Sequence, residues 1–336
     1  MRLLFVLLLA SQPSASSLSV RDGALPGFTN ELPTGLDWDP LDYSRGSEVT
    51  RGAVELGRKL FVEPALSASG QTSCATCHRP EFAFTDGLER AVGHTGIDLT
   101  RNTPTLINRA MGRSQFWDGR AEDLVEQALG PLLNPLEMGM TERLFDHRFG
   151  TDLWLESFRK GLGERPSLAG AARAIAAFEA TLVSGDSAFD RFEWNAEDTA
   201  LDAAAQRGLR LFRGSAGCST CHAGPNLTDE RFHDVGLATE DRGRGEATGR
   251  PEDLHRFKTP TLREIERTAP YMHDGRFATL EDVVEHYNRG GDDTPTRSPE
   301  IRQLGLTEEQ RADLVAFLRA LDGRVVHLSP TLFSAE

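Results

Sequence analysis

Apolar residues recur at the three-to-four-residue spacing of a helix in four segments, which are residues 167–183, 198–212, 280–288 and 314–321. Ser184-Gly185 ends the first segment, Thr279 is placed to cap the third, and Thr307 opens a capping box ahead of the fourth. The charged, glycine-rich stretch 239–251 indicates an exposed loop. Because no useful length of the sequence alternates β-branched with polar residues, the pattern predicts an all-α protein.

The two halves of the chain repeat one series of motifs, Gly-x-x-Leu-Phe, Cys-x-x-Cys-His, Thr-Pro-Thr-Leu and Asp-Gly-Arg, each in the same order. In the first half they begin at positions 57, 74, 103 and 118, and in the second at positions 208, 218, 259 and 274. The last two blocks keep one offset, since 259−103 and 274−118 both equal 156. This pattern indicates a duplicated domain. We predict domains at 18–190 and 191–336, and the last helix could pack back on the first domain.

The N-terminus carries the pattern of an export signal. Met1-Arg2 is followed by a short apolar run over residues 3–10 and then by small residues up to Ser17. Eight apolar residues cannot span a hydrocarbon core of about 30 Å, so a membrane anchor is not indicated. Residues 1–17 are therefore predicted to be a cleavable signal peptide, and the mature protein is expected in the periplasm without a membrane span.

The composition adds one restriction on partners. The 336 residues are 39% hydrophobic and 26% charged, which excludes a largely disordered chain. With 51 acidic against 37 basic residues, the formal charge is −14. A surface this acidic repels phosphate backbones and anionic lipids, so neither nucleic acid nor a membrane surface is an expected partner.

The four cysteines carry most of the chemical information. They form two Cys-x-x-Cys-His strings, Cys74–His78 and Cys218–His222, and no cysteine is left over. This string is the attachment signature of c-type haem, in which two thiols bond the haem edge and the histidine binds the iron. Disulfides do not require a following histidine, a thioredoxin-like site needs a βαβ unit, and a zinc site needs a spaced histidine pair. Two covalent haem c groups, with His78 and His222 as iron ligands, are thus predicted.

With these motifs in place, the chain resembles the bacterial di-haem cytochrome c peroxidase and MauG family over nearly all of its mature length. The resemblance implies two cytochrome c-like α domains, a peroxidatic haem on His78 and an electron-transfer haem on His222. It also implies that hydrogen peroxide is the substrate. A homodimer is one option that the resemblance leaves open.

The resemblance also assigns residues around the first haem. A distal histidine follows the first proximal histidine by sixteen positions, which gives His94. The loop Gln-Ala-x-x-Pro-x-x-x-Pro-x-Glu-Met-Gly spans 127–139 and supplies Gln127 and the acid–base residue Glu137. Trp117 matches the tryptophan between the haems. The inter-haem calcium site maps to Asn102, Thr268 and Pro270.

The second haem divides the family into two branches. Cytochrome c peroxidases place methionine fourteen residues after the histidine of a Pro-Tyr-Phe-His-x-Gly string, and MauG-like proteins place tyrosine there. Here 273+14 gives Tyr287, which is the expected sixth ligand, with Met272 and His286 as alternatives. A phenolate favours ferric iron, whereas a thioether favours ferrous iron.

Three functions remain open from the sequence. The first is a periplasmic peroxidase that takes electrons from a small redox protein such as a cytochrome c. The second is a MauG-like enzyme that oxidises side chains of a partner protein through the Tyr287-ligated haem. The third is a non-enzymatic di-haem electron carrier in which both irons are permanently six-coordinate.

Overall fold

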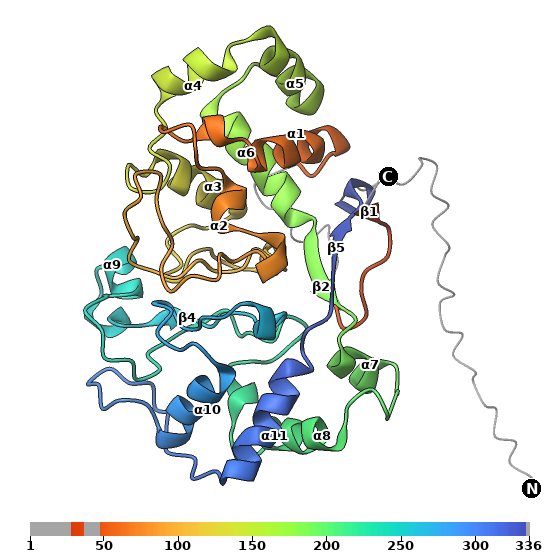
Figure 1. Cartoon of the computed structure of the whole chain (residues 1–336), viewed down its shortest axis with the longest axis vertical. Coiled ribbons are helices and arrows are strands. Elements are labelled where there is room, and N and C mark those ends of the chain that lie inside the picture. The colour runs from red at the N-terminus through yellow and green to blue at the C-terminus, as the bar shows by residue number, and fades with distance from the viewer. Residues whose placement is uncertain (1–27, 37–47, 334–336) are drawn as a thin grey trace, which may run out of the picture.

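The structure, a computed structural model, describes residues 28–36 and 48–333. The predicted signal peptide lies outside this range. The chain is mostly helical with few strands, as Figure 1 shows. Its α-helices are α1 (Arg51–Phe61), α2 (Cys74–Cys77), α3 (Leu124–Leu133), α4 (Glu142–Phe149), α5 (Asp152–Leu162), α6 (Leu168–Ala180), α7 (Ala188–Trp194), α8 (Ala203–Arg213), α9 (Arg244–Thr248), α10 (Leu280–Arg289) and α11 (Glu308–Arg319). Its strands are β1 (Phe28–Thr29), β2 (Leu182–Gly185), β3 (Phe232–His233), β4 (Phe257–Lys258) and β5 (Arg324–Leu328).

Two hydrophobic cores divide the described chain. The first is built on α1, α3 and α6, and the second on α8, α10 and α11, with the change between Val183 and Phe189. In Figure 1 the two halves lie one above the other, with α1 and α6 in the upper half and α8, α10 and α11 in the lower. Each half is one helical domain of the predicted duplication.

The repeated glycine of Gly-x-x-Leu-Phe marks the closest helix crossing in each half. A Cβ at Gly57 would lie 1.8 Å from the carbonyl oxygen of Ala174 on α6, and one at Gly208 would lie 2.0 Å from that of Asp313 on α11. No side chain fits at either distance, so α1 crosses α6, and α8 crosses α11, only because these positions are glycine. Leu60 and Phe61 of the first motif and Phe212 of the second are buried beside the crossing.

Capping residues set the helix ends much as the sequence predicts. Thr279 caps α10 through a bond from the backbone N–H of Asp282, and Gly290 ends that helix in the left-handed conformation. Thr307 and Gln310 form the expected capping box of α11. Two boundaries differ. The helix predicted from 198 begins at Ala203, and the predicted loop 239–251 contains the short helix α9.

The predicted helix over 167–183 is wrong at its C-terminal end. α6 stops at Ala180, and Leu182–Gly185 form strand β2, all four residues of which are buried. β2 pairs antiparallel with β5, and β5 pairs parallel with β1, so the sheet order is β1-β5-β2. A strand of four residues is stabilised by its partner rather than by its own propensity, and here the partner lies far along the chain.

The segment after α11 reaches the first domain. α11 itself packs against α8 and α10 in the second domain. β5 follows α11 and crosses to β2 at one side of the molecule (Figure 1). Leu328 and Phe333 then bury their side chains in the first core.

A buried ion pair joins three parts of the chain at this side. Arg263 and Asp190 are paired with 1% and 0% of their side chains exposed. Arg263 also donates to the carbonyl oxygens of Pro225 and Gly35, and Asp190 accepts from the backbone and hydroxyl of Ser187. The N-terminal segment, the interdomain linker and the second domain therefore share one buried guanidinium.

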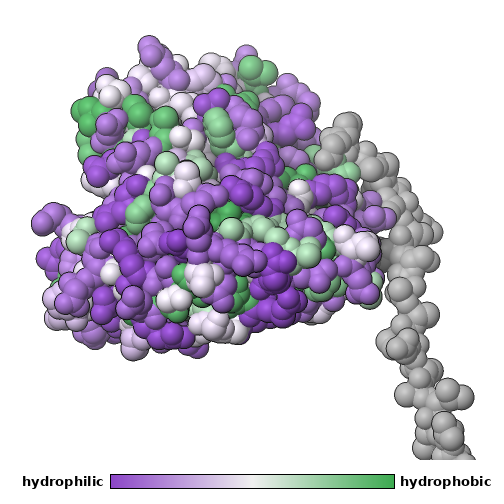
Figure 2. Space-filling view, turned by 60° about the horizontal axis from the view of Figure 1, so that its bottom comes forward, coloured by the Kyte–Doolittle hydropathy of each residue, from purple (hydrophilic) through white to green (hydrophobic). Residues whose placement is uncertain are grey.

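The face in Figure 2 is mainly hydrophilic, with limited hydrophobic areas. Within residues 28–36 and 48–333, no helix is long and apolar enough to cross a membrane.

We expect Asp190→Asn to lower the free energy of unfolding by about 3–5 kcal/mol, because it leaves the buried Arg263 cation without its counter-charge. Urea unfolding of the haem-loaded protein measures this loss. Glu55→Gln removes the exposed pair with Arg51 and should cost less than about 1 kcal/mol. Equal, small shifts for both variants would contradict the role given to the buried pair.

Candidate functional site: a cavity shared by two Cys-x-x-Cys-His motifs

One cavity of about 720 Å³ is lined by residues of both Cys-x-x-Cys-His motifs. In the first half its wall includes His78 from the turn after α2 and Gln127 from α3. In the second half it includes His222 from the turn after Cys218–Thr220 and Tyr287 from α10. The duplicated elements therefore place both motifs on one internal space.

The two motif histidines have the same hydrogen-bond arrangement. Nδ1 of His78 lies 2.9 Å from the carbonyl oxygen of Phe84, and Nδ1 of His222 lies 3.0 Å from that of Leu227. A carbonyl oxygen only accepts, so each Nδ1 carries the proton and each Nε2 keeps a free lone pair. Burial lowers the pKa of both imidazoles, which keeps them neutral. A neutral imidazole held through Nδ1 is what an iron ligand requires.

The residues that supply these two carbonyls are themselves strained. Phe84 and Leu227 both have left-handed backbones, with φ of 62° and 51°, although neither is glycine. Both are buried, so packing maintains the conformation. Such strain at equivalent points of both halves indicates a constraint on where the carbonyl points.

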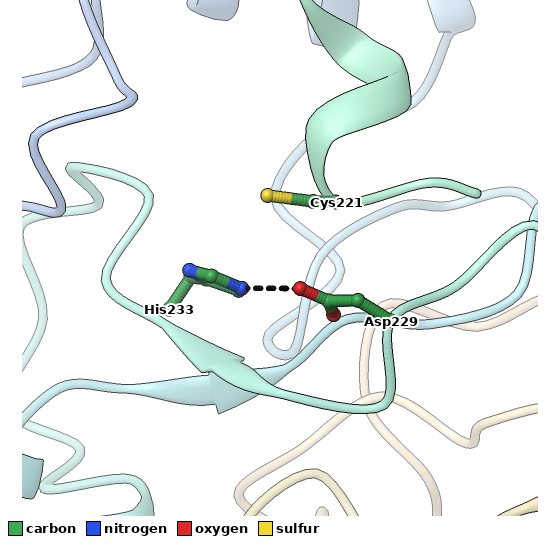
Figure 3. Close-up of side chains that lie close together, drawn as sticks. All are labelled: Cys221, Asp229 and His233. Carbon is green, nitrogen blue, oxygen red and sulfur yellow. Dashed lines mark hydrogen bonds and ion pairs between the residues drawn. The ribbon is translucent and has the colours of Figure 1, made fainter.

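The motif cysteines form no disulfide in the described chain, and one of them lies near two other possible metal ligands. All four, each within the described chain, are free. Burial raises the pKa of Cys77, Cys218 and Cys221 to about 11, so the thiols are neutral. Cys221, Asp229 and His233 lie close together (Figure 3), but His233 Nε2 is bonded to Asp229 at 2.9 Å. The donor set of two free thiols and one oriented imidazole per motif fits covalent haem c.

Glu137 lies on the wall of the cavity, on the loop after α3. Its Oε1 accepts a hydrogen bond of 2.8 Å from Asn134 Nδ2. Burial raises the pKa of the Glu137 carboxyl, and this effect is opposed by the charge of Arg120 and by the Asn134 bond. A carboxyl with a raised pKa and one oxygen that is not held by Asn134 can both accept and return a proton.

Gln127 and His94 occupy different positions relative to the cavity. Gln127 lines it, and its Oε1 is buried with no partner in the described structure. His94 contacts the same loop as Glu137, since its backbone N–H donates to the Glu137 carbonyl at 2.8 Å. Its ring is turned away, with Nε2 3.1 Å from the carbonyl oxygen of Pro135, and His94 is missing from the described residues that line the cavity.

Trp117 and Asn102 connect the two halves. Trp117 Nε1 donates to the Asn102 carbonyl at 2.9 Å, and the Trp117 carbonyl accepts from the backbone of Lys258 at 2.7 Å. The Asn102 backbone N–H in turn donates to the carbonyl of His273 at 2.8 Å. Asn102, Thr268 and Pro270, the residues predicted to hold calcium, all line the cavity.

Helices α3 and α10 are matched residue for residue. Their first residues differ by 280−124 = 156 positions and their last by 289−133 = 156. The same offset pairs Gln127 with Val283 and Pro131 with Tyr287, and all four side chains line the cavity. On the cavity wall, α3 therefore presents the amide of Gln127 and the ring of Pro131, which has no donor atom. At the equivalent positions, α10 presents the apolar side chain of Val283 and the phenol of Tyr287.

Met272 and His286, the alternatives to Tyr287 as sixth ligand, differ in whether their side chains already have a hydrogen-bond partner. His286 is buried, and its Nε2 lies 2.9 Å from the carbonyl oxygen of Val235. Met272 lines the cavity, as Tyr287 does. Burial raises the pKa of the Tyr287 phenol, so this side chain would ionise only beside a cation.

Several residues at the site were not predicted from the sequence. Asn134 and Arg120, which act on Glu137, lie inside or next to motifs that the sequence shows, but their contacts do not follow from spacing. Lys258 takes the place of Asn102 in the second Thr-Pro-Thr-Leu block, and its Nζ donates to the Ser114 carbonyl across the domain boundary at 2.6 Å. The replacement of the Asn102 amide by the Lys258 ammonium between the two repeats is the feature of the sequence that could have identified Lys258.

Comparisons with known proteins agree with this geometry. The family model for di-haem cytochrome c peroxidase matches residues 51–199, and that for cytochrome c matches residues 205–322. The chain is 41% identical to methylamine utilization protein MauG of Methylorubrum extorquens over 84% of this chain and 82% of that protein. It is 37% identical to cytochrome c551 peroxidase of Pseudomonas aeruginosa over 87% of this chain and 85% of that protein.

A solved structure extends the likeness to the whole fold. A MauG-like protein associated with microbial copper homeostasis superposes with a TM-score of 0.78 and 31% identity, covering 91% of this chain and 97% of that one. Two cytochrome c-type domains imply covalently bound haem c. The chain thus belongs to the di-haem cytochrome c peroxidase family and is a c-type di-haem peroxidase.

Proposed function

We propose that the chain holds one haem on Cys74, Cys77 and His78 and a second on Cys218, Cys221 and His222. At the first it reduces hydrogen peroxide, and an external redox protein supplies the electrons. The free Nε2 atoms of both histidines and the shared cavity support this assignment. The names of the two relatives above, a MauG protein and a cytochrome c551 peroxidase, support the reaction class.

The observation that carries the proposal is the difference between α3 and α10. Pro131 offers no atom that could bind iron, whereas Tyr287 stands at the equivalent position of the second half. An iron held by His78 would therefore keep a position for peroxide, and Tyr287 would supply a further ligand to an iron held by His222. A carrier with two permanently six-coordinate irons would need a donor atom at both positions.

The protein's part in the reaction is to move protons and to exclude competing chemistry. An open haem iron supplies the binding position for peroxide and accepts its oxidising equivalents. Glu137 takes the proton from one peroxide oxygen at its Oε2 and returns it to the departing oxygen. Asn134 holds the other carboxyl oxygen, and Gln127, whose Oε1 is unpartnered, orients the substrate.

His94 acts on this site only through the Glu137 loop in the present arrangement. As a second proton group or as a gate on the open position, it would have to release the Pro135 carbonyl and turn toward the cavity. Trp117 is hydrogen-bonded to Asn102, and its place between the halves supports a role in electron transfer from one haem to the other.

We expect Glu137→Gln to lower kcat with hydrogen peroxide by about 10²–10⁴-fold, because the amide cannot shuttle the proton. Steady-state turnover with reduced cytochrome c measures this, and the ferric spectrum should keep its high-spin component. Glu122→Gln changes an exposed acid near the start of α3 and should leave turnover unchanged. Full activity of the Glu137 variant, or wild-type iron that is entirely low-spin, would reject this mechanism.

A second function, oxidation of side chains in a partner protein, is favoured by Tyr287. A hard phenolate ligand stabilises ferric and higher oxidation states of the second haem. This haem would then store an oxidising equivalent rather than accept electrons from a high-potential donor. Turnover with reduced cytochrome c against oxidation of a candidate protein substrate separates the two functions.

We expect Tyr287→Phe to remove the sixth ligand of the second haem, because the ring keeps its volume but loses the oxygen donor. Electron paramagnetic resonance of the ferric protein should show loss of one low-spin species. Met272→Leu should leave that species in place. If the methionine variant alone removes it, the ligand is Met272 and the side-chain oxidation proposal loses its support.

Calcium is proposed between the haems, held by the Asn102 side chain and the carbonyls of Thr268 and Pro270. These residues come from both halves and line one cavity, and oxygen ligands suit calcium.

We expect Asn102→Ala to weaken calcium binding at least about 10-fold in metal analysis after chelation. Thr268→Ala keeps its carbonyl and should retain the ion, so equal loss in both variants would count against this ligand set.

Periplasmic export is proposed from the predicted signal peptide at residues 1–17. Covalent haem c attachment and a peroxidase role are compatible with that compartment.

A further inference from the structure

Glu179 is a carboxyl in the cavity wall that the proposed mechanism does not use, and it differs from Asp118, which is paired with Arg101, and from the exposed Glu246 and Glu300. It lies in the last turn of α6, with 3% of its surface exposed. Its Oε2 is buried and has no hydrogen-bond partner in the described structure. A buried carboxylate without a partner is costly, so the group is stable there only as the neutral acid.

The position of Glu179 places it beside the first haem motif. Together with Ile175, one turn earlier on α6, it lines the cavity that Cys74 also lines. Burial, and after it the charge of Glu179, raises the pKa of the Cys74 thiol, in keeping with the place of both residues on one cavity wall. A haem bonded to Cys74 would therefore have this carboxyl near its edge.

No cation compensates the carboxyl from the elements packed around it. The charged groups on α1, α3 and α5 are all exposed, and they are Arg51, Glu55, Arg58, Lys59, Glu126, Asp152, Glu156, Arg159 and Lys160. Arg109, on the buried turn that also contacts α6, is bound to Glu230 at 2.8 Å. His327, stacked on Phe178, has its pKa lowered by burial and is neutral.

Two physical effects act on Glu179 in the same direction. Burial raises its pKa to about 8. The C-terminal end of α6 carries the negative end of the helix dipole, which also opposes ionisation. A positive charge placed in the cavity would oppose both effects and favour release of the proton.

We propose that Glu179 is the charge-compensating group of the first haem, losing its proton when the iron is oxidised and regaining it when the iron is reduced. The inference rests on the proposed attachment of a haem at Cys74–His78. In each one-electron oxidation the iron would give its electron to the oxidised form of the external redox protein, or to the electrode in the test below, while the Glu179 O–H bond breaks and the proton leaves to solvent. The buried net charge is then the same before and after electron transfer.

Because proton release is coupled to oxidation of the iron, the reduction potential of the first haem is expected to depend on pH. Because oxidation releases a proton, raising the pH favours the oxidised state and lowers the reduction potential. One proton per electron is a tenfold change in the equilibrium constant per pH unit, or about 59 mV for a one-electron couple. The slope is expected around the pKa of the acid and should vanish well below it, where both redox states are protonated.

The test is a spectroelectrochemical titration of the haem-loaded protein from about pH 5 to about pH 10, with the electrode as electron acceptor. Wild type should show the sloped region at the first haem, and Glu179→Gln, which keeps shape but cannot ionise, should lose it. Asp322→Asn is the matched control. Burial raises the pKa of this carboxyl to about 7, but it lies in the second domain and does not line the cavity.

Glu137 needs a separate measurement because it is also a carboxyl on the cavity. Glu137→Gln should keep the slope if Glu179 is responsible. A slope that survives in Glu179→Gln, or that disappears in Glu137→Gln or Asp322→Asn, overturns the proposal. A wild-type potential that is independent of pH overturns it as well.

A second readout does not depend on any variant folding. Infrared difference spectra between reduced and oxidised wild type should show loss of one protonated carboxyl band on oxidation, and its absence rejects the proposal. Glu179→Gln should lack the band. If no haem is present on the first motif, the proposed function itself fails, whereas a haem with a pH-independent potential rejects only the role of Glu179.

Discussion

The hydrogen bond between each motif histidine and a backbone carbonyl is the constraint on which the site depends. It fixes Nδ1 as the donor and leaves the lone pair on Nε2 in both halves, and both histidines line the cavity. The bond exists only because Phe84 and Leu227 accept left-handed backbones that unconstrained residues of their type avoid. The packing of each domain therefore maintains strain at the point where a ligand must be oriented, and covalent attachment through the cysteines brings the iron to that ligand.

Duplication gives two similar pockets, and a few substitutions make them unequal. The paired helices α3 and α10 keep their length, their N-caps and their cavity-facing positions, while the pairs Gln127/Val283 and Pro131/Tyr287 exchange chemistry. One pocket thereby gains an amide and a nearby acid, and Pro131 offers no side-chain donor atom to it. The other pocket has the phenol of Tyr287, and it has Val283 in place of the Gln127 amide. A peroxidase needs this inequality, because one iron must meet substrate while the other handles electrons.

The contacts between the halves hold these pockets in one geometry. Trp117, Asn102 and His273 form a chain of backbone and side-chain bonds across the boundary, and Arg101 binds Asp118 and Asp241 from opposite sides of it. The sheet β1-β5-β2 and the buried Arg263–Asp190 pair close the opposite side. Electron transfer between haems depends on a fixed separation, and these contacts supply it.

The sequence by itself determined the duplication, the helical class, the two haem motifs and most helix caps, because each depends on residues close together in the chain or on a repeated spacing. It also pointed to Glu137, Gln127 and Tyr287 through the resemblance to a known family. Only the tertiary structure decided that residues 182–185 form a strand, that His94 turns away from the cavity, and that Glu179 is buried without a partner. Each of these depends on groups that approach from distant segments, and neither local periodicity nor motif spacing carries information about such groups.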